Sequence, residues 1–164
     1  MIVEDLMTRN PASVRPQHEL ALAAQLMWDR DCGVLPVTDE SRKVIGMITD
    51  RDICMATWSR ARAPNAILVA EAMSRDVILC RPEDTISRAE SIMRTNQVRR
   101  LPVTGPGQQL LGILSLADIA RAAEVAPKLA ADPDISGNGL VATLGAICTT
   151  PAPSIPRARA GASL

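Results

Sequence analysis

The chain contains no phenylalanine, no tyrosine, two tryptophans and one histidine among its 164 residues. A core must therefore be aliphatic, and the hydrophobic fraction of 47% is enough for one domain or two small subdomains. With His18 as the only histidine and no Cys-x-x-Cys spacing, no zinc-ligand set can be assembled, so we expect no metal site. We interpret Cys32, Cys54, Cys80 and Cys148 as buried, small apolar residues in preference to redox or metal-binding thiols.

Net charge is also absent, because 18 basic residues balance 18 acidic ones. No general attraction to nucleic acid or to an anionic membrane follows from such a composition. No apolar run approaches the roughly 20 residues of a membrane span, and Glu4 and Asp5 stand where a secretory signal would carry basic residues. We therefore expect a cytoplasmic protein without disulfides, and no membrane or nucleic-acid partner.

The sequence repeats itself at an offset of 66 residues. Leu35-Pro36-Val37-Thr38 recurs unchanged as Leu101-Pro102-Val103-Thr104, and the same offset aligns residues 3–56 with 69–122 without a gap. Fifteen of these 54 positions are identical. A fixed internal period shows that one supersecondary unit is used more than once, and two copies are too few for a solenoid. We therefore expect two copies packed face to face about an approximate twofold axis.

Hydrophobic periodicity gives the same element order in both copies. The first copy predicts a short helical turn at 3–7, an extended stretch at 12–14, a helix at 19–30, strands at 34–37 and 44–49, and a helix at 50–58. The second copy predicts the corresponding elements at 69–73, 78–80, 85–95, 100–103, 110–115 and 116–126. The fold class is thus α+β, with two β-α-β-β-α repeats. Since a unit of about 60 residues is marginal alone, the two sheets should cover each other.

These boundaries predict two repeats and two segments outside them. We place the repeats at 2–62 and 68–126, with an exposed connector at 59–68. From 127 to 164 the composition shifts to Ala, Pro, Gly, Ser and Thr, which predicts a largely disordered tail. An alternative for part of this tail is one short docked helix that uses Leu140, Val141, Leu144 and Ile147.

The candidate chemistry lies where the second strand of each copy runs into its closing helix. Gly46-Met47-Ile48-Thr49-Asp50-Arg51-Asp52 and Gly112-Ile113-Leu114-Ser115-Leu116-Ala117-Asp118 share a glycine, two apolar residues, a hydroxyl and an aspartate. Such a junction presents unpaired N–H groups to an anion, and the aspartate can accept hydrogen bonds from a ribose diol. A hydroxyl residue followed three positions later by an acidic residue is equally typical of a helix cap. The sequence leaves both interpretations open.

The repeat, the Leu-Pro-Val-Thr strands and Gly-Met-Ile-Thr-Asp-Arg-Asp-Ile together resemble a tandem pair of CBS domains, often called a Bateman module. The resemblance covers residues 2–124. It implies two units packed through their sheets, two clefts that often hold AMP, ADP, ATP or S-adenosylmethionine, and assembly into homodimers. It implies a regulatory sensor that requires no cofactor and catalyses no reaction.

Carried over by position, the resemblance implies a first cleft that contains Met47, Thr49, Arg51 and Asp52. Met47 would lie against adenine, Asp52 would hold the ribose hydroxyls, and Thr49 and Arg51 would reach phosphate. Arg99 and Arg100 precede Leu101-Pro102, where the family often places a basic residue that faces this cleft. Because a strand alternates its faces, at most one of the two should point inward.

The second cleft would use Ile113, Ser115 and Asp118, facing residues 32–34 of the first copy. Ala117 stands at the position of Arg51, and residues 33–34 stand at the positions of the arginine pair. We therefore expect this cleft to lack charge for a polyphosphate, so that the first cleft suits a nucleotide and the second is weak, empty or filled by a less charged adenosyl compound.

Three classes of function follow. The first is a sensor that binds an adenosyl ligand and signals to an unidentified effector by a change of shape or association. The second is an interaction module whose clefts stay empty and whose helices form a dimer surface, where Trp28 and Trp58 could lie; partial burial of both is the alternative. Against an enzyme stand the lone His18 and the lack of a nucleophile beside a base.

Overall fold

The computed structural model describes residues 1–125 and 137–148. Its helices are α1 (Val3–Leu6), α2 (Leu20–Asp29), α3 (Asp50–Arg60), α4 (Val69–Ala72), α5 (Ile86–Asn96), α6 (Leu116–Val125) and α7 (Gly137–Cys148). Its strands are β1 (Thr8–Arg9), β2 (Val34–Thr38), β3 (Val44–Thr49), β4 (Arg100–Thr104) and β5 (Leu110–Ser115), with 3₁₀ turns at Pro64–Ala66 and Pro106–Gln108. The α+β class predicted from the sequence is confirmed.

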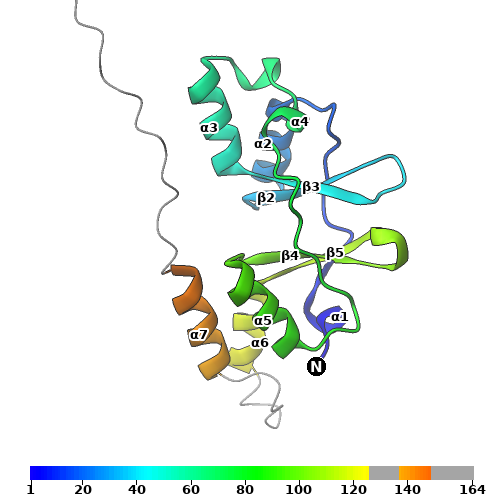
Figure 1. The fold of residues 1–164 in the computed structure, drawn as a ribbon, viewed down its shortest axis with the longest axis vertical. Coiled ribbons are helices and arrows are strands. Elements are labelled where there is room, and N and C mark those ends of the chain that lie inside the picture. The colour runs from blue at the N-terminus through cyan, green and yellow to red at the C-terminus, as the bar shows by residue number, and fades with distance from the viewer. Residues whose placement is uncertain (126–136, 149–164) are drawn as a thin grey trace, which may run out of the picture.

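The two hairpins lie across the middle of the molecule, with α2, α3 and α4 on the outer side of the β2–β3 hairpin and α1, α5 and α6 on the outer side of the β4–β5 hairpin (Figure 1). The antiparallel registers match under the 66-residue offset, since Val34 pairs with Thr49 and Arg100 pairs with Ser115. Each hairpin also shifts register before its last pair, at Thr38 and at Thr104. The repeat in the sequence is therefore a repeat in backbone geometry.

Helix α2 illustrates how the apolar pattern selects a face. Leu20, Ala23 and Met27 recur at helical spacing and are buried, while Ala24, which we included in the same stripe, is exposed. The helix ends at Arg30, and Asp31 then adopts a left-handed conformation that turns the chain toward β2. This ending brings residues 30–32 to the edge where the two repeats meet.

The two repeats exchange their first residues, here called the leading segments, so that each hydrophobic core contains the leading segment of the other repeat. The first core combines residues of α2, β2, β3 and α3 with Ile67, Val69 and Met73, whereas Val3 and Met7 pack with α5, β4, β5 and α6. The backbone shows the same exchange, because Val3 N donates to Asp84 O and Leu20 N donates to Ile67 O, both at 2.9 Å. The two repeats are thus fastened together by their leading segments.

The glycine of each junction motif is required by this exchange. A Cβ at Gly46 would lie 2.8 Å from the Ser74 carbonyl oxygen, and one at Gly112 would lie 2.6 Å from Met7 Sδ. The leading segments pass too close to the hairpins for any side chain there. Glycine at these positions therefore fixes how the two repeats are joined.

Two expectations about connecting segments need correction. The stretches at 12–14 and 78–80 form single parallel bridges, Val14 with Val37 and Cys80 with Val103, rather than strands. The connector at 59–68 is exposed except for Ile67, which is fully buried in the first core. Ile67 is buried because its carbonyl accepts the Leu20 N–H and so holds it against α2.

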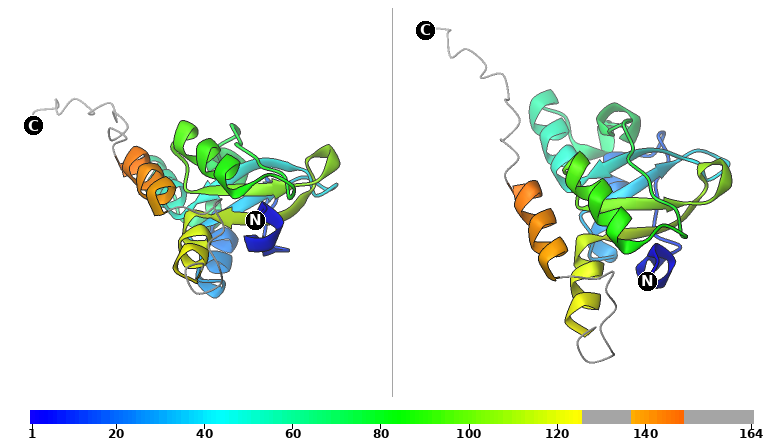
Figure 2. Two further views of the ribbon diagram at one scale, coloured as in Figure 1. Left: turned by 90° about the horizontal axis from the view of Figure 1, so that it is seen from below. Right: turned by 60° about the horizontal axis from the view of Figure 1, so that its bottom comes forward.

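Helix α7 lies beside α5 and α6, outside the repeats (Figure 2). Leu140 and Ile147 pack against the second core, while Val141 and Leu144 are exposed. This helix corresponds to the docked segment that the sequence left as an alternative. The rest of the tail predicted from residue 127 lies outside the described residues.

Candidate functional site

The junction motifs form helix caps in both repeats. Asp52 Oδ2 accepts hydrogen bonds from the Thr49 N–H at 2.9 Å and the Thr49 hydroxyl at 2.7 Å, and Asp52 N–H donates to Thr49 Oγ1 at 3.1 Å. Ser115 and Asp118 make the same three bonds. The capping interpretation is therefore correct for both motifs. It does not exclude a ligand, because each cap uses only one carboxylate oxygen, Oδ2.

The remaining carboxylate oxygens have different surroundings in the two repeats. Asp118 Oδ1 forms an ion pair with Arg121, whose side chain is largely exposed. The residue that corresponds to Arg121 in the first repeat is Met55, and both hydrogen bonds described for the Asp52 carboxylate use Oδ2. A ligand at Asp118 would therefore have to displace Arg121, whose side chain is 69% exposed, so solvent screening keeps the cost of displacing it small.

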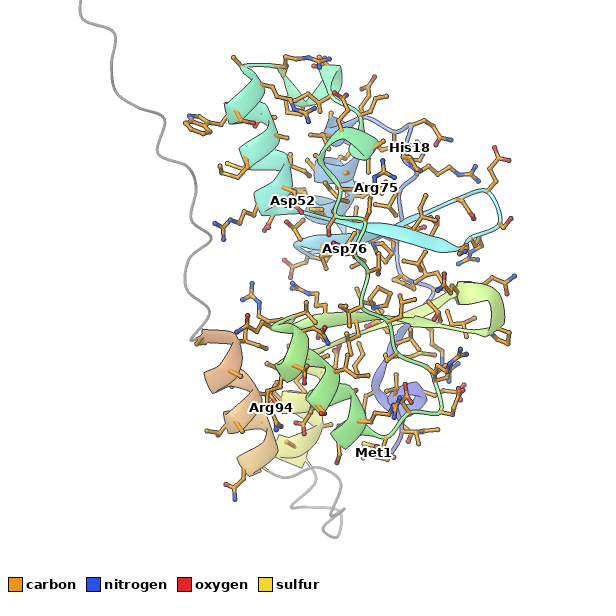
Figure 3. All side chains as sticks on the ribbon, in the orientation of Figure 1. Met1, His18, Asp52, Arg75, Asp76 and Arg94 are labelled. Carbon is orange, nitrogen blue, oxygen red and sulfur yellow. The ribbon has the colours of Figure 1, made fainter. Side chains whose placement is uncertain are left out.

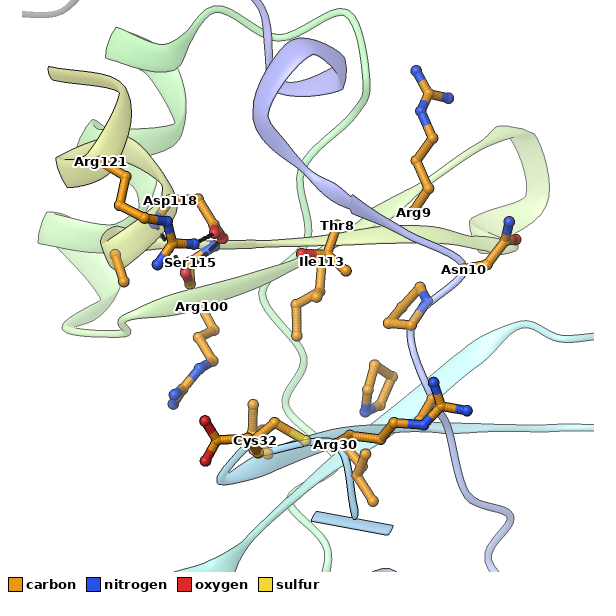
Figure 4. Close-up of a pocket in the computed structure, with 17 residues that line it drawn as sticks. Thr8, Arg9, Asn10, Arg30, Cys32, Arg100, Ile113, Ser115, Asp118 and Arg121 are labelled. Carbon is orange, nitrogen blue, oxygen red and sulfur yellow. Dashed lines mark hydrogen bonds and ion pairs between the residues drawn. The ribbon is translucent and has the colours of Figure 1, made fainter. Parts of the chain in front are cut away.

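A cavity of about 470 Å³ opens between the repeats at the second junction (Figure 4). It contains Ile113, Ser115 and Asp118, as predicted, and lies against Cys32 and Val34 of the first repeat. Its lining is Thr8, Arg9, Asn10, Pro11, Ala12, Arg30, Asp31, Cys32, Val34, Leu35, Pro36, Arg100, Ile113, Ser115, Ala117, Asp118 and Arg121. The second cleft predicted from the sequence therefore exists in the fold.

The prediction that this cleft lacks charge is wrong. Four arginines and two aspartates line it, so positive charge is in excess. Arg9 points away from the cavity and pairs with Glu4 at 3.0 Å, while Arg100 extends from β4 into the space toward Cys32 (Figure 4). Within residues 1–125 and 137–148, the structure describes no ion pair for Arg30 or Arg100. These two guanidinium groups can therefore bind an anion.

Arg100, which the resemblance placed against the first cleft, lines this second cleft, and its role in the first cleft stays a prediction. Arg100 pairs with Ser115 across the β4–β5 hairpin, so the two residues lie at the same end of the same hairpin. The hairpin was predictable, and its register would have placed Arg100 beside Ser115. Arg30 was not predicted as a site residue. No motif in the neighbouring sequence indicates a site there, because Arg30 joins the cavity from the end of α2 only in the folded chain.

A second cavity, of about 490 Å³, adjoins the first and shares Arg100, Ser115 and Ala117 with it. Its other lining residues are Gly33, Asp50, Arg99, Leu116, Ala120, Leu140 and Leu144. Arg99 therefore lines only this second cavity. Arg100 stands at the boundary between the two cavities, where it can reach a ligand that extends from one to the other.

Met47, Thr49, Arg51 and Asp52 line neither of these two cavities. Met47 exchanges both of its backbone hydrogen bonds with Ser74 at 2.9 Å, just as Ile113 is opposed by Thr8 in the other repeat. Asp52 lies beside the upper hairpin, in the same region as Arg75 and Asp76 (Figure 3). A ligand role for these four residues stays a prediction.

Histidine and cysteine do not gather into a candidate metal site among the described residues. Groups of three or more potential metal ligands do not occur in residues 1–125 and 137–148. Cys80 is buried and desolvation raises its pKa to about 12, but Cys54 and Cys148 are exposed, which corrects the expectation of four buried thiols. His18 Nδ1 accepts the Arg15 N–H at 3.2 Å. In the same ranges, no helix has the length and apolar character needed to cross a bilayer.

Comparison with known proteins identifies the class. The CBS domain family model matches residues 3–58 and 69–125, and the chain belongs to this family as a pair of CBS repeats. The pair is a regulatory module in form. The resemblance inferred from the sequence is confirmed.

Individual relatives match this chain over a similar share of its length, about three quarters. The CBS domain-containing protein YhcV of Bacillus subtilis is 35% identical over 118 residues, which are 72% of this chain and 82% of YhcV. The crystal structure of hypoxic response protein I with two coordinated zinc ions is 31% identical, with a TM-score of 0.68 over 74% of this chain and 98% of that one.

Two further solved structures share the fold at 24% identity. One is the CBS pair of protein MJ0100 with 5′-methylthioadenosine and S-adenosylmethionine, with a TM-score of 0.68 over 74% of this chain and 94% of that one. The other is CBSX2 in complex with AMP, with a TM-score of 0.66 over 77% and 98%.

Proposed function

We propose that this chain is a regulatory sensor that binds an adenosine 5′-phosphate in the cavity between the repeats that Arg100 and Ile113 line. The observation that carries the proposal is that one cavity combines an apolar wall, a paired hydroxyl and carboxylate, and unpaired guanidinium groups. The candidate ligands predicted from the sequence, AMP, ADP and ATP, all have the complementary groups: an adenine ring, a ribose diol and a phosphate. The proposed site differs from the first cleft, which the sequence favoured.

The apolar part of the lining suits an adenine ring. Pro11, Ala12, Leu35, Pro36 and Ile113 supply apolar surface to this lining. A volume of about 470 Å³ lies in the usual range of small-molecule sites. Asp118 then lies where it can accept hydrogen bonds from the ribose hydroxyls, once they replace Arg121 at Oδ1.

The charged part of the lining selects among adenosyl ligands. A phosphate gains paired hydrogen bonds from a guanidinium group, and Arg100, which extends into the cavity, is available for this contact, whereas Arg30 extends toward Asn10 (Figure 4). S-Adenosylmethionine has a net positive charge, with its sulfonium bonded directly to C5′ of the ribose, and an excess of arginine repels that charge. The arginines therefore favour AMP, ADP or ATP over S-adenosylmethionine, although structures that share this fold hold ligands of both kinds.

A ligand between the two repeats can act as a signal only by binding two states of the molecule differently. The cavity is built from both repeats, since Arg30 and Cys32 come from one and Arg100 and Asp118 from the other. Binding therefore favours one relative placement of the repeats. An effector protein that contacts both repeats would sense this change.

A second candidate function is a homodimerisation or interaction module that needs no ligand. It is favoured by Trp28 and Trp58, whose side chains are 88% and 72% exposed on α2 and α3. Light scattering of the Trp58→Ala variant against the wild type tests it. A dimer that persists unchanged in this variant would exclude Trp58 from the interface.

The test of the ligand proposal is calorimetric titration of the whole chain with AMP, using Asp118→Ala and Asp52→Ala as a matched pair. Both variants lose the two cap bonds that the carboxylate accepts and keep the backbone N–H bond to the hydroxyl, so both lose similar helix stability, about 1 kcal/mol; Asp118→Ala also loses the exposed Arg121 from its pair. Only Asp118 lines the cavity, so Asp118→Ala should weaken AMP binding about tenfold or more while Asp52→Ala changes it less than about twofold. Equal losses, or no heat with any adenine nucleotide, would refute the proposal.

A further inference from the structure

Helix α7 lies outside the residues that the family model matches, yet it is part of the described structure. Thr143 is fully buried, donates its hydroxyl to Gly139 O at 2.9 Å and accepts the Arg94 guanidinium at 3.3 Å. Arg94 lies on the side of α5 that faces α7 (Figure 3). The helix is therefore held by its contacts with α5 and the second core.

The composition of α7 makes its helical state depend on these contacts. Three of its 12 residues are glycine, the ordinary residue that least favours a helix interior, and none is charged. An isolated helix of this length and composition is not stable in water. We therefore expect α7 to unfold when it leaves α5 and the second core, so that it has two states, docked as a helix and undocked as an unfolded segment.

The same helix forms one wall of the second cavity. Leu140 and Leu144 face this space from α7, and Asp50 lines it from the start of α3. The cavity begins at Arg100, where the phosphate of a ligand in the first cavity would end. Any further phosphates must enter a space bordered by two leucines and the Asp50 carboxylate, in which Arg99 and Arg100 are the opposing charges.

We propose that Leu140, Leu144 and Asp50 set the phosphate-chain length of the ligand, so that the site prefers a nucleoside monophosphate. This inference rests on the proposed function and adds its specificity. A second or third phosphate would lose water against the leucines and would be repelled by Asp50. A triphosphate is accommodated only when α7 leaves its place, which couples polyphosphate binding to the loss of α7 structure. By linkage, a substitution that stabilises docked α7 weakens triphosphate binding and leaves monophosphate binding unchanged.

The experiment compares the affinities for AMP and ATP in the whole chain and in three variants. Leu144→Lys replaces a partly exposed leucine by a cation, and Asp50→Asn removes the repelling charge. Each should tighten ATP binding by about two- to fivefold and leave AMP within about twofold. Gly145→Ala introduces a Cβ that meets no atom within 4 Å, so it stabilises α7 and should weaken ATP up to about fivefold.

Hydrogen exchange of residues 137–148 supplies a readout independent of affinity. Saturation with ATP should lower the protection of α7, and saturation with AMP should not. If neither nucleotide binds, the proposed function fails and this inference fails with it. If both bind but the AMP-to-ATP ratio and the protection of α7 stay the same in all variants, only the specificity is refuted and the site stands.

Discussion

Replacing Arg100 by methionine removes one guanidinium group from the boundary of the two cavities and keeps an apolar stem of similar length. A hydrogen bond to a charged group contributes about 1.5–3 kcal/mol. Arg100 is half-buried, so solvent screening favours the lower end of that range. About 1.5 kcal/mol corresponds to roughly a tenfold weaker affinity for AMP.

The sign of the effect should reverse for a cationic ligand. S-Adenosylmethionine places a sulfonium where AMP places phosphate, so Arg100→Met should leave its binding unchanged or tighten it. Calorimetric titration of both ligands therefore separates loss of a charge contact from general damage to the cavity. Raising the salt concentration should weaken AMP binding in the wild type more than in the variant.

Two controls accompany this measurement. Arg99→Met removes the neighbouring guanidinium, which is exposed and lines only the second cavity, so AMP binding should change less than about twofold. The midpoint of thermal unfolding should barely move in Arg100→Met without ligand, because no described ion pair of Arg100 is lost. Equal effects of the two substitutions on AMP would refute the placement of phosphate at Arg100.

The other predictions concern stability. Burial raises the pKa of Glu90 on α5, so the wild type should lose stability as pH rises from 4.5 through this raised pKa. Denaturant unfolding should find Glu90→Gln more stable than the wild type at pH 7.5 and similar to it below pH 4.5; an unchanged difference across this range would contradict the assignment. Gly112→Ala places a Cβ 2.6 Å from Met7 Sδ and should cost about 1–3 kcal/mol of unfolding free energy, and a neutral result would show that the leading segment adjusts. Thr143→Val removes the bond with Arg94 and should cost about 1 kcal/mol, seen as faster hydrogen exchange in α7; unchanged exchange would mean that apolar contacts alone hold the helix.

Much of this fold could be predicted because its signals are local in sequence. The helical stripe of Leu20, Ala23 and Met27 and the two hairpins depend on residues at most a few turns apart, and the 66-residue repeat follows from comparing the sequence with itself. The caps at Thr49 and Ser115 belong to the same category, since donor and acceptor are three residues apart. The sequence by itself therefore determined the α+β class, the element order and the family.

Tertiary structure decided which of these local parts meet. Val3 and Met7 begin the first repeat but lie in the second core, and Arg30 reaches the cavity from the end of a helix whose sequence carries no sign of a site. Arg100 belongs to the second cleft through its pairing with Ser115, and α7 encloses the space beyond it. A periodic pattern fixes the face on which a side chain lies, whereas the neighbour of that face depends on register and on helix packing across the two repeats.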